Sequence, residues 1–443
     1  MFVLAATGSA VGLGNIWRFP YITAENGGGA FVLVYLVCIL LIGVPILAAE
    51  LSIGRRARRS PVNALRSLAR SDSGGRYWWL FGYLGMGAGL LILSFLSVIA
   101  GSAMAYMVRT AGGVFEGVTA RGAESIFIGL IGDPERLLAW HTLFMAVTTV
   151  IVARGVRLGL EWAAKYLVPV FFLLLLLLVL GGYLFHPEAF WQGVGLLFYP
   201  EFSALTANGI LVAMGHAFFT LSLGMGVMII YGSYLPAGTH IGKMSLAVAA
   251  TDTLAALLAG LAVFPWVLGN GLEMGVGPGL VFQTLPVAFG QTPAGSWFGA
   301  LFFLLLVIAA LTSAISLFEP TVAWLVENKS MGRPRAAAWV GGGAWLAGIL
   351  TVMSLGPWAF DFQFAGELRV KGMFDILDIL TSVIMLPAGG LAVALFAGWV
   401  LYRSRTLEAL GKDGVRFRLG YLVLRYVTPL SLAAIFVHTI GVI

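Results

Sequence analysis

The stretch Gly8-Ser-Ala-Val-Gly-Leu-Gly-Asn15 interrupts an otherwise apolar segment of membrane-spanning length near the start of the chain. A second interruption, Thr220-Leu-Ser-Leu-Gly-Met-Gly226, lies inside another apolar segment in the second half. Backbone that leaves a helix within hydrocarbon has unsatisfied polar groups, so it persists only where it lines a cavity or binds something. Two interrupted segments in corresponding halves of a chain indicate the binding site of a membrane transporter.

The composition is that of an integral membrane protein. Of the 443 residues, 60% are hydrophobic and 10% are charged, whereas roughly a quarter of the residues in soluble domains are charged. We therefore expect an all-α polytopic protein embedded in the lipid bilayer. About eleven apolar segments are long enough to cross it; they lie near 2–24, 29–54, 77–110, 138–153, 161–184, 206–233, 242–270, 297–327, 335–355, 374–402 and 417–442.

The positions of the two interruptions predict an internal repeat. Segments 1–184 and 206–402 each hold five expected helices, and each opens with an interrupted one. Because five is odd, the second block enters the membrane with opposite polarity, which gives a five-plus-five inverted repeat with discontinuous helices 1 and 6. Helix 417–442 lies outside the repeat, within one transport domain over 1–443. Only roughly 10 Å of helix precedes the first interruption, so we expect residues upstream of Met1 to be missing.

Basic residues are concentrated in alternate loops. They are Arg55, Arg56, Arg58, Arg59, Arg66, Arg70, Arg76, Arg154, Arg157, Lys165, Lys243, Lys329, Arg333, Arg335, Arg403, Arg405, Lys412, Arg416 and Arg418. The positive-inside rule places these loops and the N-terminus in the cytoplasm, with the chain in the cell's inner (plasma) membrane. The net charge of +6 is spread over short loops, so no nucleic acid is expected as a partner. The oligomeric state is left open.

Oxygen-bearing side chains lie inside both interruptions. Ser9 and Asn15 belong to the first, and Thr220 and Ser222 belong to the second. Half-helix N-termini suit a carboxylate, while half-helix C-termini and free carbonyls suit a cation. The alternative is close packing, since small residues let membrane helices approach one another. The occurrence of both interruptions in one chain favours a binding site.

Other polar residues fall within the expected spans. Asp252 lies in the seventh, where a carboxylate is costly and indicates a functional site by default; a structural acceptor is the alternative. Thr312 and Ser313 place two hydroxyls in the eighth, although such hydroxyls often bond to their own helix backbone. Arg18 and Asp378 lie near the outer ends of their helices, where they form a gate or are unrelated interfacial residues.

Three more residues favour structural roles. Glu50 and Glu319 are expected to accept hydrogen bonds from unwound backbone rather than to relay protons. His216 lies one turn before the second interruption; it can titrate near neutral pH, but we expect a hydrogen-bonded structural histidine. Cys38 is the only cysteine, which excludes an intrachain disulfide. The sequence contains no nucleophile–base pair or metal-ligand cluster, so an enzyme is not expected.

The residues around the interruptions resemble the signature of the neurotransmitter:sodium symporters. Ser9-Ala-Val-Gly-Leu-Gly-Asn-Ile-Trp-Arg-Phe-Pro20, followed by Glu25-Asn-Gly-Gly-Gly-Ala-Phe31, is similar to the first helix of that family. Phe218-Phe-Thr-Leu-Ser-Leu-Gly224 resembles its sixth helix, and Leu311-Thr-Ser313 resembles its eighth. The resemblance covers essentially the whole chain and points to the bacterial, eleven-helix, leucine-transporter-like branch. It implies sodium-coupled uptake of a small hydrophobic or aromatic L-amino acid by alternating access.

The resemblance also implies two sodium sites and a substrate pocket. The first sodium site would use Ala10, Asn15, Thr220 and Asp252, and the second Gly8, Val11, Ala309, Thr312 and Ser313. All-oxygen shells of this kind suit a hard cation. The substrate would contact Ser9, Gly12, Leu13, Gly14, Ile92, Leu96, Phe219, Thr220, Ser222, Met225, Ser313 and Leu317. Phe219 resembles the aromatic lid, and Arg18 with Asp378 resembles the outer gate.

The sequence departs from the family pattern at four places. Leu96 stands where a tyrosine usually holds the substrate carboxylate. His216 and Ala256 replace a glutamine and a serine of the chloride site, of which Tyr35 is kept, so chloride is not expected to be required. Glu327 lacks the basic N-terminal partner that the matching acid has in relatives.

Two alternatives from other classes remain. Leu96 suggests a non-transporting amino-acid sensor or degenerate relative, which substrate binding without counterflow in proteoliposomes would favour. The second is a proton-coupled carrier that uses Asp252, Glu319 or His216. Uptake driven by a pH gradient in sodium-free buffer would favour it.

Overall fold

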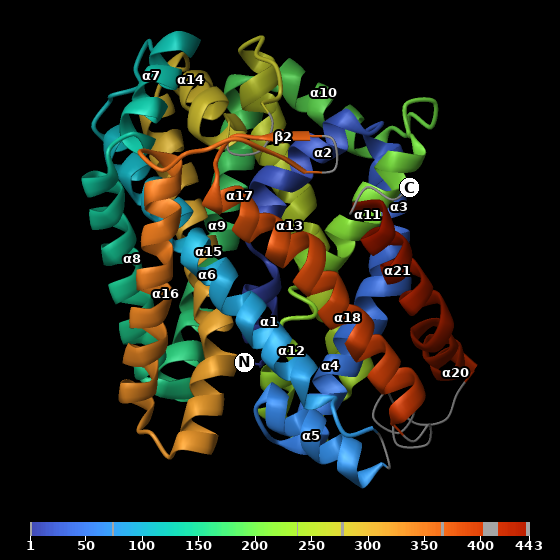
Figure 1. The fold of residues 1–443 in the computed structure, drawn as a ribbon. Coiled ribbons are helices and arrows are strands. Elements are labelled where there is room, and N and C mark those ends of the chain that lie inside the picture. The colour runs from blue at the N-terminus through green and yellow to red at the C-terminus, as the bar shows by residue number, and fades with distance from the viewer. Residues whose placement is uncertain are drawn as a thin grey trace.

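The computed structural model describes residues 2–72, 75–236, 238–275, 279–364, 367–401 and 415–439. The described part is a helical bundle (Figure 1), and nine of its helices are long and apolar enough to cross a membrane. They are Gly29–Ala57, Trp79–Ala111, Pro134–Ala153, Leu158–Phe185, Ile241–Gly269, Gly295–Lys329, Arg333–Leu355, Met373–Val400 and Leu419–His438. The expected all-α polytopic architecture is confirmed. Arg403, Arg405 and Lys412, used above for orientation, lie outside the described residues.

The first interrupted helix is broken over fewer residues than expected. It consists of α1 (Phe2–Ala10), the π-helix η1 (Gly14–Arg18) and α2 (Phe19–Glu25). Helical structure extends into the quoted glycine-rich stretch because the Val11 N–H still donates to the Thr7 carbonyl at 2.7 Å. The break is therefore confined to a bend around Val11 and Gly12.

The second interrupted helix has a true linker at 221–226, between α11 (Ala207–Thr220) and α12 (Val227–Ser233). Ser222, Gly224 and Gly226 have φ angles of 54°, 83° and 75°, a left-handed conformation that glycine adopts readily and other residues seldom do. The Gly224 N–H donates to Glu50 Oε1 at 2.7 Å. This contact confirms the expected role of Glu50 beside unwound backbone.

The remaining elements surround these two helices. In order they are α3 (Gly29–Cys38), η2 (Ile39–Gly43), α4 (Val44–Ala57), α5 (Pro61–Ser71), α6 (Trp79–Ala111), α7 (Ala120–Ile131), α8 (Pro134–Ala153), η3 (Val156–Glu161), α9 (Trp162–Phe185), α10 (Pro187–Phe198), α13 (Ile241–Gly269), η4 (Leu280–Thr284), α14 (Leu285–Gly290), α15 (Gly295–Lys329), α16 (Arg333–Leu355), β1 (Phe362–Phe364), β2 (Glu367–Arg369), α17 (Met373–Asp378), η5 (Ile379–Met385), α18 (Leu386–Leu395), η6 (Phe396–Val400), α20 (Val415–Leu422), η7 (Val423–Val427) and α21 (Thr428–Thr439). α12 packs along α4, whereas α15 packs along α6 and α16 along α8.

Several helix starts carry the caps that backbone chemistry favours. Thr119, Asp133 and Thr206 each accept a hydrogen bond from a backbone N–H three residues further on, at 3.2, 3.1 and 3.0 Å. Such caps satisfy N–H groups that have no partner within the helix. The connection between α13 and α15 contains the short helices η4 and α14 where it is described.

Candidate functional site

Asp252 is the centre of a buried oxygen cluster that joins both interrupted helices. Its Oδ1 accepts a hydrogen bond from Asn15 Nδ2 at 2.8 Å, and Thr220 Oγ1 lies 3.1 and 3.0 Å from the two carboxylate oxygens. The Tyr35 hydroxyl lies 3.5 Å from Oδ2. Asn15, Thr220, Asp252 and Tyr35 are all buried. The structure thus gathers four side chains from segments that are far apart in the sequence.

The two breaks also contact each other directly. Ser222 Oγ donates to the Ser9 carbonyl at 3.0 Å, and the Gly12 N–H donates to Asn15 Oδ1 at 3.0 Å. Ser9 Oγ is buried and has no hydrogen-bond partner among the described residues. A free buried hydroxyl beside two unwound segments is available to a bound molecule.

The α15 hydroxyls lie against the first break. A β-carbon at Gly8 would lie 3.7 Å from Thr312 Cβ, and one at Gly12 would lie 2.9 Å from Ser313 Oγ. Thr312 Oγ1 donates to the carbonyls of Ile308 and Ala309, at 3.2 and 3.0 Å. The back-bonding considered for Thr312 is therefore present, and it places the hydroxyl next to the Ala309 carbonyl.

The apolar residues of the expected pocket are buried around these breaks. Ile92, Leu96, Met225 and Leu317 are between 5% and 8% exposed. Ile92 and Leu96 lie four residues apart on α6, which places them on one face of that helix. Leu317 on α15 packs against Gly89, which lies one turn before Ile92 on α6. The residue at the position of the family tyrosine, Leu96, is thus a buried aliphatic side chain.

The expected outer gate residues are not paired with each other. Arg18 lies over the Phe219 ring, 5.6 Å from its centroid, and Asp378 accepts a hydrogen bond from Ser382 at 2.9 Å. The ion pairs between described residues do not include Arg18 with Asp378. Phe219 is therefore covered by the guanidinium, in the geometry of a cation–π contact.

His216 differs from expectation. Its ring packs against Phe19 and Tyr35, with centroid distances of 5.7 and 5.6 Å, and those two rings also contact each other at 5.2 Å. Neither ring nitrogen has a hydrogen-bond partner among the described residues. The expected hydrogen-bonded histidine is wrong, because both neighbours present aromatic rings to the imidazole. His216 is instead a packing element beside the Asp252 cluster.

Glu319 also differs from expectation. It accepts hydrogen bonds from the Tyr234 hydroxyl and from two nitrogens of the Arg333 guanidinium. Of these two nitrogens, Nη1 lies 3.0 Å from Glu319 Oε1. Arg333 Nε donates to the Val152 carbonyl at 3.1 Å. The acid thus joins the end of α12 to α15, α16 and α8, and does not bind unwound backbone. The sequence offered no signal for this network, because Arg333 lies among ordinary loop cations.

Glu327 has partners that the sequence did not indicate. Its carboxylate accepts hydrogen bonds from the Ser60 N–H, the Ser60 hydroxyl and Asn63 Nδ2, each at 2.7 Å. These donors belong to the start of α5. Glu327 therefore connects the end of α15 to the start of α5.

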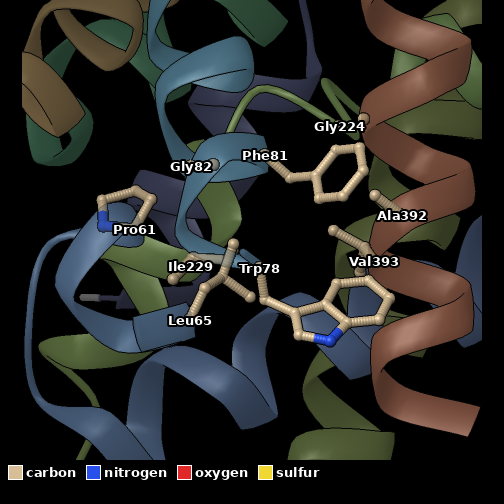
Figure 2. Close-up of a pocket in the computed structure, with 11 residues that line it drawn as sticks. Pro61, Leu65, Trp78, Phe81, Gly82, Gly224, Ile229, Ala392 and Val393 are labelled. Carbon is tan, nitrogen blue, oxygen red and sulfur yellow. The ribbon is translucent and has the colours of Figure 1, made fainter. Parts of the chain in front are cut away.

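A small apolar cavity lies beside the second break (Figure 2). Its lining residues are Pro61, Leu65, Trp78, Phe81, Gly82, Gly224, Gly226, Ile229, Gly389, Ala392 and Val393. Among these described residues there is no carboxylate, hydroxyl or amide side chain. The cavity therefore offers charged groups no oppositely charged side chain as a partner.

Two helices broken inside a membrane-spanning bundle, with oxygen ligands gathered at the breaks, define a secondary transporter. A family model described as the sodium:neurotransmitter symporter family matches residues 1–113 and 128–442. The chain belongs to this family, whose members are sodium-dependent transporters and not enzymes.

Curated relatives align along nearly all of the chain. The uncharacterized sodium-dependent transporter YhdH of Bacillus subtilis is 36% identical, over 100% of this chain and 96% of its own length. An uncharacterized sodium-dependent transporter of Haemophilus influenzae is 32% identical, over 99% of this chain and 96% of its own. A solved structure, MhsT in complex with L-phenylalanine, has a TM-score of 0.87 and 41% identity, and the match covers 99% of this chain and 98% of that one.

Proposed function

We propose that this protein uses the inward sodium gradient to take up a small hydrophobic or aromatic L-amino acid by alternating access, without chloride. The observation that carries the proposal is the buried cluster in which Asp252 joins Asn15 and Thr220 of the two broken helices. The L-phenylalanine bound to the related MhsT supports the substrate class. The proposal includes a plasma-membrane location with the N-terminus in the cytoplasm. Sodium-driven uptake of a panel of amino acids into proteoliposomes tests it.

In this proposal sodium binds at two places. The first site uses Asp252 and Thr220 with the amide oxygen of Asn15 and the carbonyl of Ala10. Asn15 Oδ1 accepts from the Gly12 N–H in the described state, so sodium would replace that donor. The second site uses Gly8, Val11, Ala309, Thr312 and Ser313, whose oxygens are of the type that hard cations prefer.

The substrate is proposed to lie between the breaks and the apolar wall. Its charged groups face Ser9, Gly12, Leu13, Gly14, Thr220, Ser222 and Ser313, and its side chain faces Ile92, Leu96, Met225, Phe219 and Leu317. Met225 is unbranched and polarisable, so it adapts to side chains of several shapes. Charged side chains are excluded because the wall offers them no partner. Phe219 closes over the substrate, and Arg18 with Asp378 forms the outer gate when the vestibule shuts.

Leu96→Tyr is expected to tighten binding of leucine or tryptophan by about tenfold or more. The new hydroxyl would donate to the substrate carboxylate, and a hydrogen bond to a charged group contributes about 1.5–3 kcal/mol. Ligand binding to purified protein at fixed sodium measures the change. Leu96→Phe is the matched control, because it adds the ring without the hydroxyl. Loss of binding of the native substrate in Leu96→Tyr, with Leu96→Phe active, would show that the pocket is built for a different substrate class.

Uptake is expected to be nearly normal when gluconate replaces all chloride. Asp252 places a fixed negative charge beside the first sodium site, and Ala256 removes a hydroxyl that an anion would need. Opposite unit charges 4 Å apart attract by about 4 kcal/mol at an effective dielectric of about 20, which is enough to make a bound anion dispensable. The measurement is the initial uptake rate in matched chloride and gluconate buffers. A collapse of uptake in gluconate would rule out chloride independence.

A further inference from the structure

The segment 55–76 is strongly basic, with seven arginines and a single acidic residue, Asp72. Three of the arginines bind within the protein. Arg55 donates to the Thr239 carbonyl at 2.6 Å and Arg58 to the Ser233 carbonyl at 3.2 Å. Arg56 forms an ion pair with Asp72 at 3.3 Å. The one acid of the segment is thus paired with Arg56, and four arginines of the segment are left without a role in these contacts.

The other four arginines form no ion pair with any described residue. Arg59, Arg70 and Arg76 are exposed, and Arg66 is partly exposed. Arg66 and Arg70 lie four residues apart on α5, so their charges are neighbours on one helix face. Like charges at this spacing destabilise a helix by a few tenths of a kcal/mol. An anion bound between them would remove that repulsion.

A row of aromatic rings lies beside these arginines. The Arg66 guanidinium lies 5.3 Å from the Trp79 ring centroid. Trp79 packs on Tyr83 at 5.6 Å, and Tyr83 packs on Trp324 at 5.5 Å. Tryptophan and tyrosine gather where a membrane protein meets the headgroup layer. The stacking therefore places Arg66 beside aromatic rings of the kind that are enriched at the headgroup layer.

The helix α5 packs its apolar side against the protein and turns a basic side outward. Its apolar side chains, among them Val62, Leu65 and Leu68, are buried, and Leu65 lines the cavity beside the second break (Figure 2). The helix lies at one end of the bundle (Figure 1), and its polar side carries Arg66 and Arg70. Clusters of basic residues beside a membrane-spanning helix attract anionic lipid headgroups.

We propose that Arg59, Arg66, Arg70 and Arg76, with Tyr77 and Trp79, form a binding surface for the headgroups of anionic phospholipids. Arginine suits this role because its planar guanidinium binds phosphate oxygens through paired hydrogen bonds and stacks on aromatic rings. The proposal does not depend on which solute the protein transports.

The helix that carries the proposed lipid surface also contacts Glu327 and the second interrupted helix. Glu327 holds the start of α5 through Ser60 and Asn63. Pro61 packs so closely on the second break that a β-carbon at Gly226 would lie 2.8 Å from its ring. Headgroups bound to α5 therefore stabilise a helix that contacts both Glu327 and the linker between α11 and α12.

The test titrates the purified protein in detergent with phosphatidylglycerol or with phosphatidylcholine of the same chain length, and counts bound lipids by native mass spectrometry. Phosphatidylglycerol is expected to bind more tightly, with an affinity that falls as salt is raised. In Arg66→Gln/Arg70→Gln that affinity is expected to fall roughly fivefold for each arginine removed, the factor equivalent to about 1 kcal/mol per charge. Arg66→Lys/Arg70→Lys is expected to keep most of it.

The matched control is Arg121→Gln/Arg335→Gln, which removes two exposed arginines from α7 and α16 and is expected to leave phosphatidylglycerol binding unchanged. Thermal unfolding of each variant reports whether it is folded. Equal affinities for the two lipids in the unaltered protein would overturn the proposal without any variant. An equal loss in the control pair, or no loss in the Arg66 and Arg70 pair, would overturn it as well.

Discussion

Asp252→Asn is expected to lower the sodium affinity of the first site by on the order of a hundredfold, because it removes the only full negative charge of the cluster. The asparagine keeps an oxygen that accepts from Asn15 and Thr220, which contact Asp252 at 2.8 and 3.0 Å. The shape of the site is retained while its charge is lost. The sodium dependence of amino-acid binding to purified protein measures the effect.

The control for this change is Glu201→Gln, which neutralises an exposed acid outside the cluster and is expected to leave the sodium dependence unchanged. If Asp252→Asn binds its amino acid with the sodium dependence of the unaltered protein, Asp252 is not a sodium ligand. In that case the cluster is a structural link between the two broken helices, which was the alternative for an intramembrane carboxylate.

Replacing both α15 hydroxyls, as Thr312→Ala with Ser313→Ala, is expected to raise the sodium concentration for half-maximal uptake more than tenfold. A partly dehydrated cation would lose two ligands, and polar contacts to charged groups contribute about 1.5–3 kcal/mol each. Uptake into proteoliposomes over a sodium series measures the shift.

The double variant Thr148→Ala/Ser245→Ala serves as its control. Both hydroxyls are buried and bond to a carbonyl of their own helix, at 2.8 and 2.9 Å, as Thr312 does. Their removal is expected to leave the sodium requirement unchanged. Equal shifts in the two double variants would mean that Thr312 and Ser313 act through helix packing, and an unshifted requirement in the α15 variant would remove the second-site assignment.

The sequence was sufficient to predict the helices and the main polar cluster, for a physical reason. Hydrocarbon excludes unpaired polar groups, so glycine breaks and the carboxylate of Asp252 stand out within apolar segments. A polar side chain inside the membrane has few possible hydrogen-bond partners. This is why the two breaks and Asp252 could be singled out, and why Glu50 was correctly placed beside the unwound Gly224. The grouping of Asn15 and Thr220 with Asp252 was implied by the resemblance to the symporter family.

The contacts at the helix ends could not be predicted in the same way. Tyr234, Arg333 and Glu319 meet only because α12, α15 and α16 have particular rotations about their axes. Polar residues near helix ends can also be satisfied by water or headgroups, so their presence does not require a protein partner. For His216 the opposite error arose: its imidazole was expected to form a hydrogen bond, but it packs in a cluster with the rings of Phe19 and Tyr35.

The connection between Glu327 and α5 bears on how this end of the bundle moves in time. The Ser60 N–H, the Ser60 hydroxyl and the Asn63 amide all bind one carboxylate, and all belong to the beginning of a single helix. Any movement that takes α5 away from α15 must break all three of these hydrogen bonds. The barrier to separating the two helices therefore includes the loss of every partner that the described residues give to one carboxylate.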